Sequence, residues 1–173
     1  MADIDTQPTT DLAGAKAAEK IVEIANGMRS CMFTTAPTEF PPNACPMALQ
    51  KAEVDGSIWF ISSSESDKNH DIARDPRVVI TLQNDSTSQY LSVAGHATIH
   101  TDKTTIDKYW TSFANAWFQG KDDPRVTIIC VRPTAGHYWD TQHGKTLAMV
   151  KMTFAALTGT KVDDGGIEGA LKL

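Results

Sequence analysis

The sequence has few cysteines, no long apolar run and no excess of basic residues. Its three cysteines, Cys31, Cys45 and Cys130, form no close pair, which argues against a disulfide framework and favours the reducing cytoplasm. No apolar stretch reaches the roughly 18 residues that a membrane-spanning helix needs. Sixteen Lys and Arg against 21 Asp and Glu give a net charge of −5. A general nucleic-acid binder needs a basic face, so we expect neither a nucleic-acid nor a membrane partner.

Several catalytic and targeting motifs are absent too. We find no Gly-rich dinucleotide fingerprint, no phosphate-binding P-loop and no nucleophile elbow. The polar, acidic start of the chain lacks the basic and apolar regions of a signal peptide. His96 and His100 lie four residues apart, but in a predicted strand and away from any Cys or His cluster. We therefore expect these two side chains to be solvated and predict no metal site.

The length and the 41% apolar content predict one domain. We assign a flexible N-terminus to residues 1–10, the domain to 11–160 and a C-terminal tail to 161–173. Residues 12–28 show a helical apolar stripe that includes Ala17, Ile21 and Ile24. Further helices are predicted at 67–74, after Thr101 and at 147–157, and strands at 30–36, 45–54, 57–62, 77–82, 89–101, 125–132 and 135–140.

The spacing of these elements decides the fold class. Parallel strand pairs need crossovers of about a dozen residues, and most connections here are shorter. The sequence therefore predicts a mainly β (α+β) protein, an antiparallel barrel with peripheral helices. Gly95, inside the fifth predicted strand, indicates a bulge or a barrel corner.

The most informative segment runs from Trp59 to Lys68. A short apolar strand enters a loop rich in hydroxyls, and a helix is predicted to begin at Ser66. A helix start presents unpaired backbone N–H groups and a partial positive charge. Together with Lys68, the loop hydroxyls form a candidate phosphate site. The alternative is a serine loop that only caps its helix.

Two aromatic groups need an explanation. The residues Trp110, Phe113 and Trp117 follow helical spacing, which is typical of a core or of a dimer interface. Trp139 stands near the end of a predicted strand, where it could cover a flat ligand. His137 should lie on the same side of that strand as Trp139, and we expect it to be a surface residue.

Four segments in this order resemble the general stress proteins of the pyridoxamine 5'-phosphate oxidase-like, FMN-binding split-barrel family. They are Pro46-Met47; Ile58 to Ser62 with Ser66-Asp-Lys68; Asp75 to Val78 with Ser92 to Gly95; and Asp122 to Pro124 with Tyr138-Trp-Asp140. The resemblance extends over about 18–159 and implies an antiparallel split β-barrel. It also implies a homodimer with flavin at its interface, the cofactor being FMN, with FAD as the alternative.

The resemblance also implies cofactor-binding residues, position by position. Pro46 and Met47 would follow the edge of the isoalloxazine ring, and Phe60, Ile61, Ser62 and Ser63 would lie under the ring and ribityl chain. Ser66 and Lys68 would hold the phosphate, and Trp139 would reach across the dimer. Relatives often have Arg where this chain has Cys45. Cys cannot supply the cationic fork of Arg, so either flavin binding is weaker or the Cys45 thiol alters the redox behaviour of the ring.

The implied function is a flavin-binding redox protein, for which the sequence names no catalytic residue. One alternative is a non-catalytic flavin-binding or flavin-buffering protein. Another is a reductase or oxidase of a small flat substrate with a nicotinamide donor. A third is a different flat ligand, haem or a deazaflavin, in the same position. We do not expect vitamin B6 oxidation, because the arginines of a pyridoxamine-phosphate pocket cannot be located.

Overall fold

The structure is a computed structural model that describes residues 9–141 and 166–173. The helices are α1 (Ala15–Asn26), α2 (Asp67–Arg74), α3 (Lys103–Tyr109) and the 3-10 helix η1 (Ser112–Ala116). The strands are β1 (Leu12–Ala13), β2 (Ser30–Thr35), β3 (Asn43–Ala52), β4 (Ile58–Ser63), β5 (Arg77–Asn84), β6 (Gln89–His100), β7 (Val126–Thr141) and β8 (Gly166–Lys172). No helix in these two described ranges is long and apolar enough to cross a membrane.

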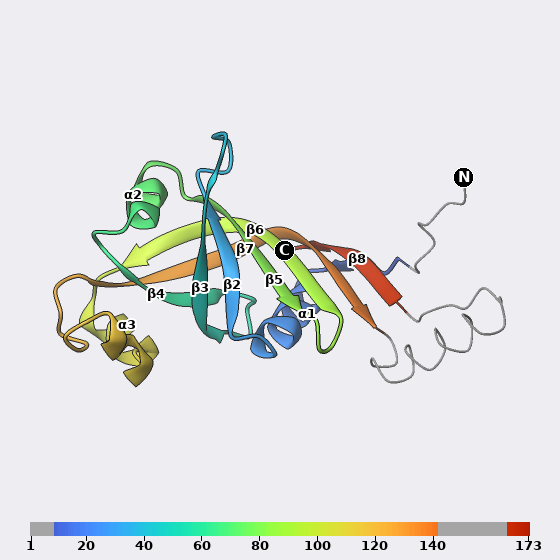
Figure 1. The fold of residues 1–173 in the computed structure, drawn as a ribbon. Coiled ribbons are helices and arrows are strands. Elements are labelled where there is room, and N and C mark those ends of the chain that lie inside the picture. Colours follow the sequence, from blue (N-terminus) through green and yellow to red (C-terminus); the bar gives the residue numbers. More distant parts are fainter. Residues whose placement is uncertain (1–8, 142–165) are drawn as a thin grey trace.

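Six antiparallel strands close into a barrel, which confirms the predicted fold class. The strand order is β7-β4-β3-β2-β5-β6, and a further pairing between β6 and β7 closes the ring. The long strand β7 pairs with β4 along 126–131 and with β8 along 135–141, so it belongs to the barrel and to an extension of the sheet. Figure 1 shows α2 and α3 near one end of the barrel, away from β8.

The barrel core follows the alternation of the strands. In β4 the alternate residues Ile58, Phe60 and Ser62 are buried, as expected for a strand with one face on the core. Phe60 meets Phe33 of β2 edge to face, with ring centroids 5.2 Å apart. The apolar stripe of α1, including Ile21, packs into the same core. The other face of β4 is therefore left to form a surface site.

The bulge predicted at Gly95 is present where β6 meets β7. Consecutive residues Ala94 and Gly95 pair with Ala135 and Pro133, so Thr134 is an extra residue on β7. A Cβ atom on Gly95 would lie only 2.4 Å from the backbone oxygen of Arg132. Only glycine allows this close approach, and a bulge tolerates Pro133, which cannot donate a ladder hydrogen bond. As a result β7 continues through Pro133, where the sequence predicted two strands.

The chain ends differ from the prediction because they pair with each other. Leu12 and Ala13 form β1 against β8, so α1 begins at Ala15 rather than at residue 12. The predicted tail 161–173 contains β8, and the Thr10 N–H, in the segment predicted to be flexible, donates to the Glu168 carbonyl at 2.7 Å. Such pairing joins residues more than 150 positions apart, which local patterns do not show. The helix predicted at 147–157 lies outside the described residues.

We predict that Gly95→Ala lowers the free energy of unfolding by about 2 kcal/mol or more, because backbone atoms cannot move away as a flexible side chain can. The matched control is Gly27→Ala. Gly27 has φ −79 and its nearest neighbour would be 3.4 Å from a new Cβ, so we expect a change of no more than about 0.5 kcal/mol. Urea unfolding of both variants measures the difference. Equal stability of the two would contradict the proposed closure of the barrel at Gly95.

Candidate functional site

The site lies where β4 runs into α2. The strand ends at Ser63, the chain turns, and α2 begins after Ser66, whose backbone is extended with φ −81 and ψ 145. This confirms the predicted order of strand, serine loop and helix. The first backbone N–H groups of a helix have no acceptor within it, and here they follow directly after the loop.

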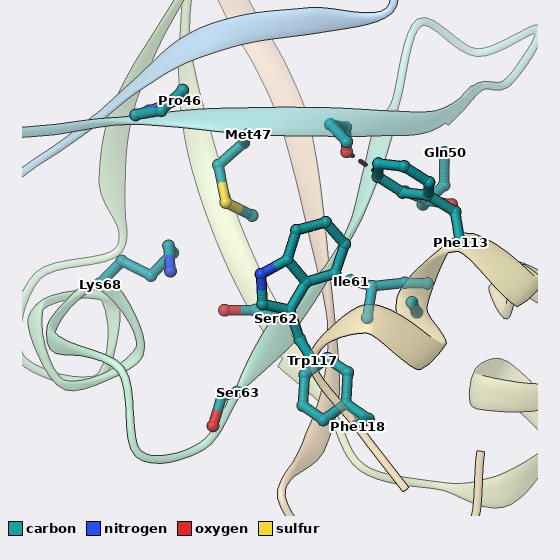
Figure 2. A pocket seen from close by; sticks show the side chains of 12 residues that line it. Pro46, Met47, Gln50, Ile61, Ser62, Ser63, Lys68, Phe113, Trp117 and Phe118 are labelled. Carbon is teal, nitrogen blue, oxygen red and sulfur yellow. Dashed lines mark hydrogen bonds between the residues drawn. The ribbon is translucent and has the colours of Figure 1, made fainter. Parts of the chain in front are cut away.

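A first cavity of about 280 Å³ lies over the outer face of β4. β3, β4, the start of α2 and the η1 segment contribute its walls (Figure 2). The lining is mainly apolar: Pro46, Met47, Ala48, Gln50, Ile61, Ser62, Ser63, Lys68, Phe113, Ala114, Trp117 and Phe118. The described lining contains no carboxylate, imidazole or thiol. We call this space the ring cavity.

A second cavity of about 410 Å³ shares Lys68 with the first. Its lining is polar: Thr35, Asn43, Ala44, Cys45, Glu65, Ser66, Asp67 and Lys68. We call it the polar cavity. Lys68 lines both cavities, so a ligand with a flat apolar part and an anionic tail could contact it from either side.

Lys68 differs in its surroundings from most of the other lysines that the structure describes. It is partly buried, and it forms no ion pair with any residue that the structure describes. By comparison, Lys20 pairs with Asp140 at 3.0 Å and Lys108 with Glu53 at 3.0 Å. Glu65 and Asp67 line the polar cavity with it, so the positive charge there is local to the ammonium group and the helix start.

The serine hydroxyls are not all directed at the cavities. The Ser66 hydroxyl donates to the Ser63 carbonyl at 2.7 Å, and the Ser62 hydroxyl donates to Asn69 Oδ1 at 2.8 Å. Asn69, itself buried, donates from Nδ2 to the Thr127 hydroxyl at 2.9 Å. A hydroxyl has one proton to give. The donors left for an anion are therefore Lys68, the first amides of α2 and the Ser63 hydroxyl.

A buried carboxylate fixes the other side of α2. Asp71 accepts hydrogen bonds of 2.7 Å from both the Thr35 hydroxyl and the Asn43 amide, and it pairs with Arg74. The bond from Thr35, followed by that from Asn43, holds the pKa of Asp71 below its usual range in spite of burial. Thr35 and Asn43 also line the polar cavity, so Asp71 connects α2 to its wall.

The predicted site residues divide into three groups. Pro46, Met47, Ile61, Ser62 and Ser63 line the ring cavity, Cys45 and Ser66 line the polar cavity, and Lys68 lines both. Phe60 lies in the core, fully buried, and lines neither. Four further residues line the ring cavity without having been predicted to do so: Gln50, Phe113, Trp117 and Phe118. Their aromatic spacing had indicated only that Phe113 and Trp117 belong to a core or a dimer interface.

Trp139 lies elsewhere in this chain. It pairs with Tyr90 and Glu168 on β6 and β8, lines neither cavity and is 38% exposed. Its ring is 4.5 Å from that of His137, which confirms that the two share a side of the strand, and His137 Nε2 lies 3.4 Å from Glu168. The predicted contact of Trp139 with a flavin is therefore not made within the lining of either cavity of this chain.

Burial makes Cys31 and Cys130 poor nucleophiles. Desolvation, helped by the neighbouring Cys45, raises the pKa of Cys31 to about 12. Burial also raises the pKa of Cys130. All three cysteines are free thiols. Among the described residues, no group of three metal-binding side chains comes together, and His96 and His100 lie on the outside of β6, partly or fully exposed.

Comparison with known families identifies the fold. The family model described as "Pyridoxamine 5'-phosphate oxidase like" matches residues 16–163, most of the chain. The chain belongs to this family. Protein bli-3 of Neurospora crassa is 31% identical over 152 residues, covering 79% of this chain and 69% of that protein. General stress protein 26 of Bacillus subtilis is 36% identical over 80 residues, 44% of this chain and 57% of that protein.

Solved structures of family members share the architecture. A general stress protein 26 from Jannaschia sp. CCS1 matches with a TM-score of 0.72 at 23% identity, covering 92% of this chain and 96% of that one. General stress protein 26 of Bacillus anthracis str. Sterne matches with a TM-score of 0.62 at 27% identity, covering 70% of this chain and 92% of that one. A general stress FMN/FAD binding protein from Xanthomonas citri matches with a TM-score of 0.60 at 22% identity, covering 72% of this chain and 87% of that one. These likenesses support the split-barrel fold.

We predict that Asp71→Asn lowers the free energy of unfolding at pH 7 by about 2 kcal/mol, because an amide can replace only part of the acceptors of a buried, multiply bonded carboxylate. Since the folded pKa is depressed, this stabilisation is complete above the unfolded pKa and is lost as the pH falls through the folded one. The difference from wild type should therefore shrink below about pH 4. Denaturant titrations from pH 7 to 3 measure it.

The control is Asp75→Asn, which removes a more exposed carboxylate paired with Arg77. Its effect on stability should be clearly smaller, as is usual for solvent-screened ion pairs. If Asp75→Asn costs as much as Asp71→Asn, or if the effect of Asp71→Asn does not depend on pH, Asp71 is not the anchor of α2.

Proposed function

We propose that this protein binds FMN, with the isoalloxazine ring in the ring cavity and the phosphate in the polar cavity. The observation that carries the proposal is the position of Lys68, a cation without an ion-pair partner among the described residues, between an apolar and a polar space. Charge-assisted bonds to phosphate are about twice as strong as neutral ones. The first amides of α2 add donors on the same side, while the Ser63 hydroxyl is a further donor on the side of the ring cavity.

The ring cavity suits a flat, largely apolar ring. Met47 and Ile61 offer apolar surface, while Gln50 and Ser63 place polar groups at its rim (Figure 2). This combination of apolar walls and few polar groups is the usual composition of a cofactor site. FAD, which carries a second nucleotide, is the alternative cofactor.

Of the two consequences considered for Cys45, its position favours weaker flavin binding over an altered redox behaviour of the flavin ring. The thiol stands where relatives often carry Arg, and it lines the polar cavity rather than the ring cavity. Loss of a cationic fork on the phosphate side removes a strong anion contact. Lys68 then supplies most of the positive charge, and we expect a single lysine substitution to have a large effect.

We further propose a homodimer with the flavin at its interface, acting in the reducing cytoplasm. Trp139 is exposed and lies away from both cavities of its own chain, as expected for a residue that completes the site of a partner. The three free cysteines agree with a reducing compartment.

The function that follows is that of a flavin-dependent redox protein. The protein would bind and orient the flavin, which supplies electron transfer when bound. A nicotinamide would be the electron donor and a small flat molecule the substrate. The second candidate is a flavin-binding or flavin-buffering protein. In its favour, the described lining of the ring cavity offers no carboxylate, imidazole or thiol, and Lys68 is its only ionisable side chain.

We predict that Lys68→Ala weakens FMN binding at least tenfold at low ionic strength, because it removes the charge-assisted contact with phosphate. Ser66→Ala should weaken binding by less, since the Ser66 hydroxyl already donates to the Ser63 carbonyl. Titration of the apoprotein, followed by flavin fluorescence, measures the affinities, and light scattering of the same samples should give the mass of a dimer.

Lys16→Ala is the matched control. Lys16 is exposed on α1 and lines neither cavity, so its loss alters net charge by the same amount without touching the site. Equal affinities for FMN in the Lys68 and Lys16 variants would refute the phosphate assignment. Wild-type protein that binds no flavin would refute the proposed function itself.

The two candidates differ in their response to a reduced nicotinamide. For a redox enzyme, anaerobic mixing of the FMN-loaded protein with NADPH or NADH should bleach the visible flavin band at a rate that saturates with nicotinamide concentration. For a flavin carrier, the band should persist or fade no faster than that of free FMN. Stopped-flow absorbance, with free FMN as the control, separates the two.

A further inference from the structure

Two large aromatic side chains are left exposed beside the ring cavity. Phe113 and Trp117 are 64% and 62% exposed, and both line the cavity. Their rings meet edge to face, with centroids 5.1 Å apart and planes at 65°. Exposed aromatic surface next to a cavity marks a place where something binds.

The η1 segment that carries them is fixed to the barrel. The Thr111 hydroxyl donates to Gln50 Oε1 at 3.1 Å, which connects the start of η1 to β3. The amide of Trp117 donates to the Ala114 carbonyl at 3.0 Å, and Ala114 is buried. Phe118, the next residue, packs with Trp110 in a separate apolar cluster under the segment. Phe113 and Trp117 are therefore held in place by their neighbours while their own faces stay open.

We propose that Phe113 and Trp117 form an aromatic wall that stacks on the flat ring of the flavin, so that Trp117 is a ring-binding residue. The inference rests on the proposed function, which it extends by assigning the side of the ring cavity opposite β3 and β4. Stacking on a planar ring uses the faces that are exposed now and adds an attraction beyond burial of area.

The surroundings favour a flat ring as the occupant over a second copy of the chain. Figure 2 shows the Trp117 indole directed toward Met47, among the side chains that line the ring cavity. Lys68 lines the same cavity, so the anionic tail of a ring stacked on Trp117 could reach the ammonium group. A planar molecule with an anionic arm meets both features together.

The test compares two probes, FMN and riboflavin, which share the ring and differ in the phosphate. Trp117→Leu should weaken the binding of FMN and of riboflavin by a similar factor, roughly tenfold, because stacking of a base on an aromatic side chain has that magnitude. Phe113→Leu should weaken both by a smaller factor. Lys68→Ala should weaken only FMN. Fluorescence of bound riboflavin should also rise in Trp117→Leu, since a stacked indole quenches it by electron transfer.

Trp59→Leu is the control. Trp59 lies on β4, stacks on Tyr109 with ring centroids 4.2 Å apart and lines neither cavity, so both affinities should match wild type. Circular dichroism checks that each variant is folded, and light scattering gives its mass. Unchanged riboflavin affinity and fluorescence in folded Trp117→Leu would overturn the aromatic wall. So would weaker binding that only accompanies loss of a dimer, which would assign Trp117 to the interface between chains.

Discussion

The site depends on the buried hydrogen bonds that fix the start of α2. Asn69 connects Ser62 of β4 to Thr127 of β7, while Asp71 connects the same helix to β2 and β3. Buried polar groups are costly when unpaired, so such a network permits one orientation of the helix. That orientation places Lys68 between the two cavities and leaves its ammonium group without a carboxylate in the described chain.

In the proposed complex, the two cavities would recognise the two parts of the flavin by different interactions. The ring cavity offers apolar area and exposed aromatic faces, which select for planarity. The polar cavity offers the Lys68 ammonium group and backbone donors, which favour an anionic group close to them, although Glu65 and Asp67 line the same cavity. Cys45 in place of a cation makes the second contribution smaller than the family resemblance implies. In the proposed complex, ring contacts from Phe113 and Trp117 would then carry a larger share of the affinity, which would explain why two exposed aromatic side chains line the cavity.

Sequence patterns predicted those parts that local chemistry determines. The short strand β4, the serine loop and the helix start depend on neighbours in the chain, and the bulge where β6 meets β7 was indicated by Gly95 itself. The failures have non-local causes. β1 and β8 exist only because the two chain ends pair. The helical aromatic spacing after Thr101 predicted one helix, but the extended backbone of Trp110 (φ −63, ψ 134) ends α3. The Ser66 hydroxyl is an exception, because it is turned away from an anion by a local bond to the Ser63 carbonyl.

The central claim is that Lys68 and the start of α2 hold the phosphate of a flavin whose ring lies against β4. A crystal structure of the protein grown with FMN tests it most directly. We predict electron density for the phosphate within hydrogen-bond distance of Lys68 Nζ and the first amides of α2, with the ring between Met47 and Trp117. Density for FMN at any other place, with Lys68 solvated, would contradict the account.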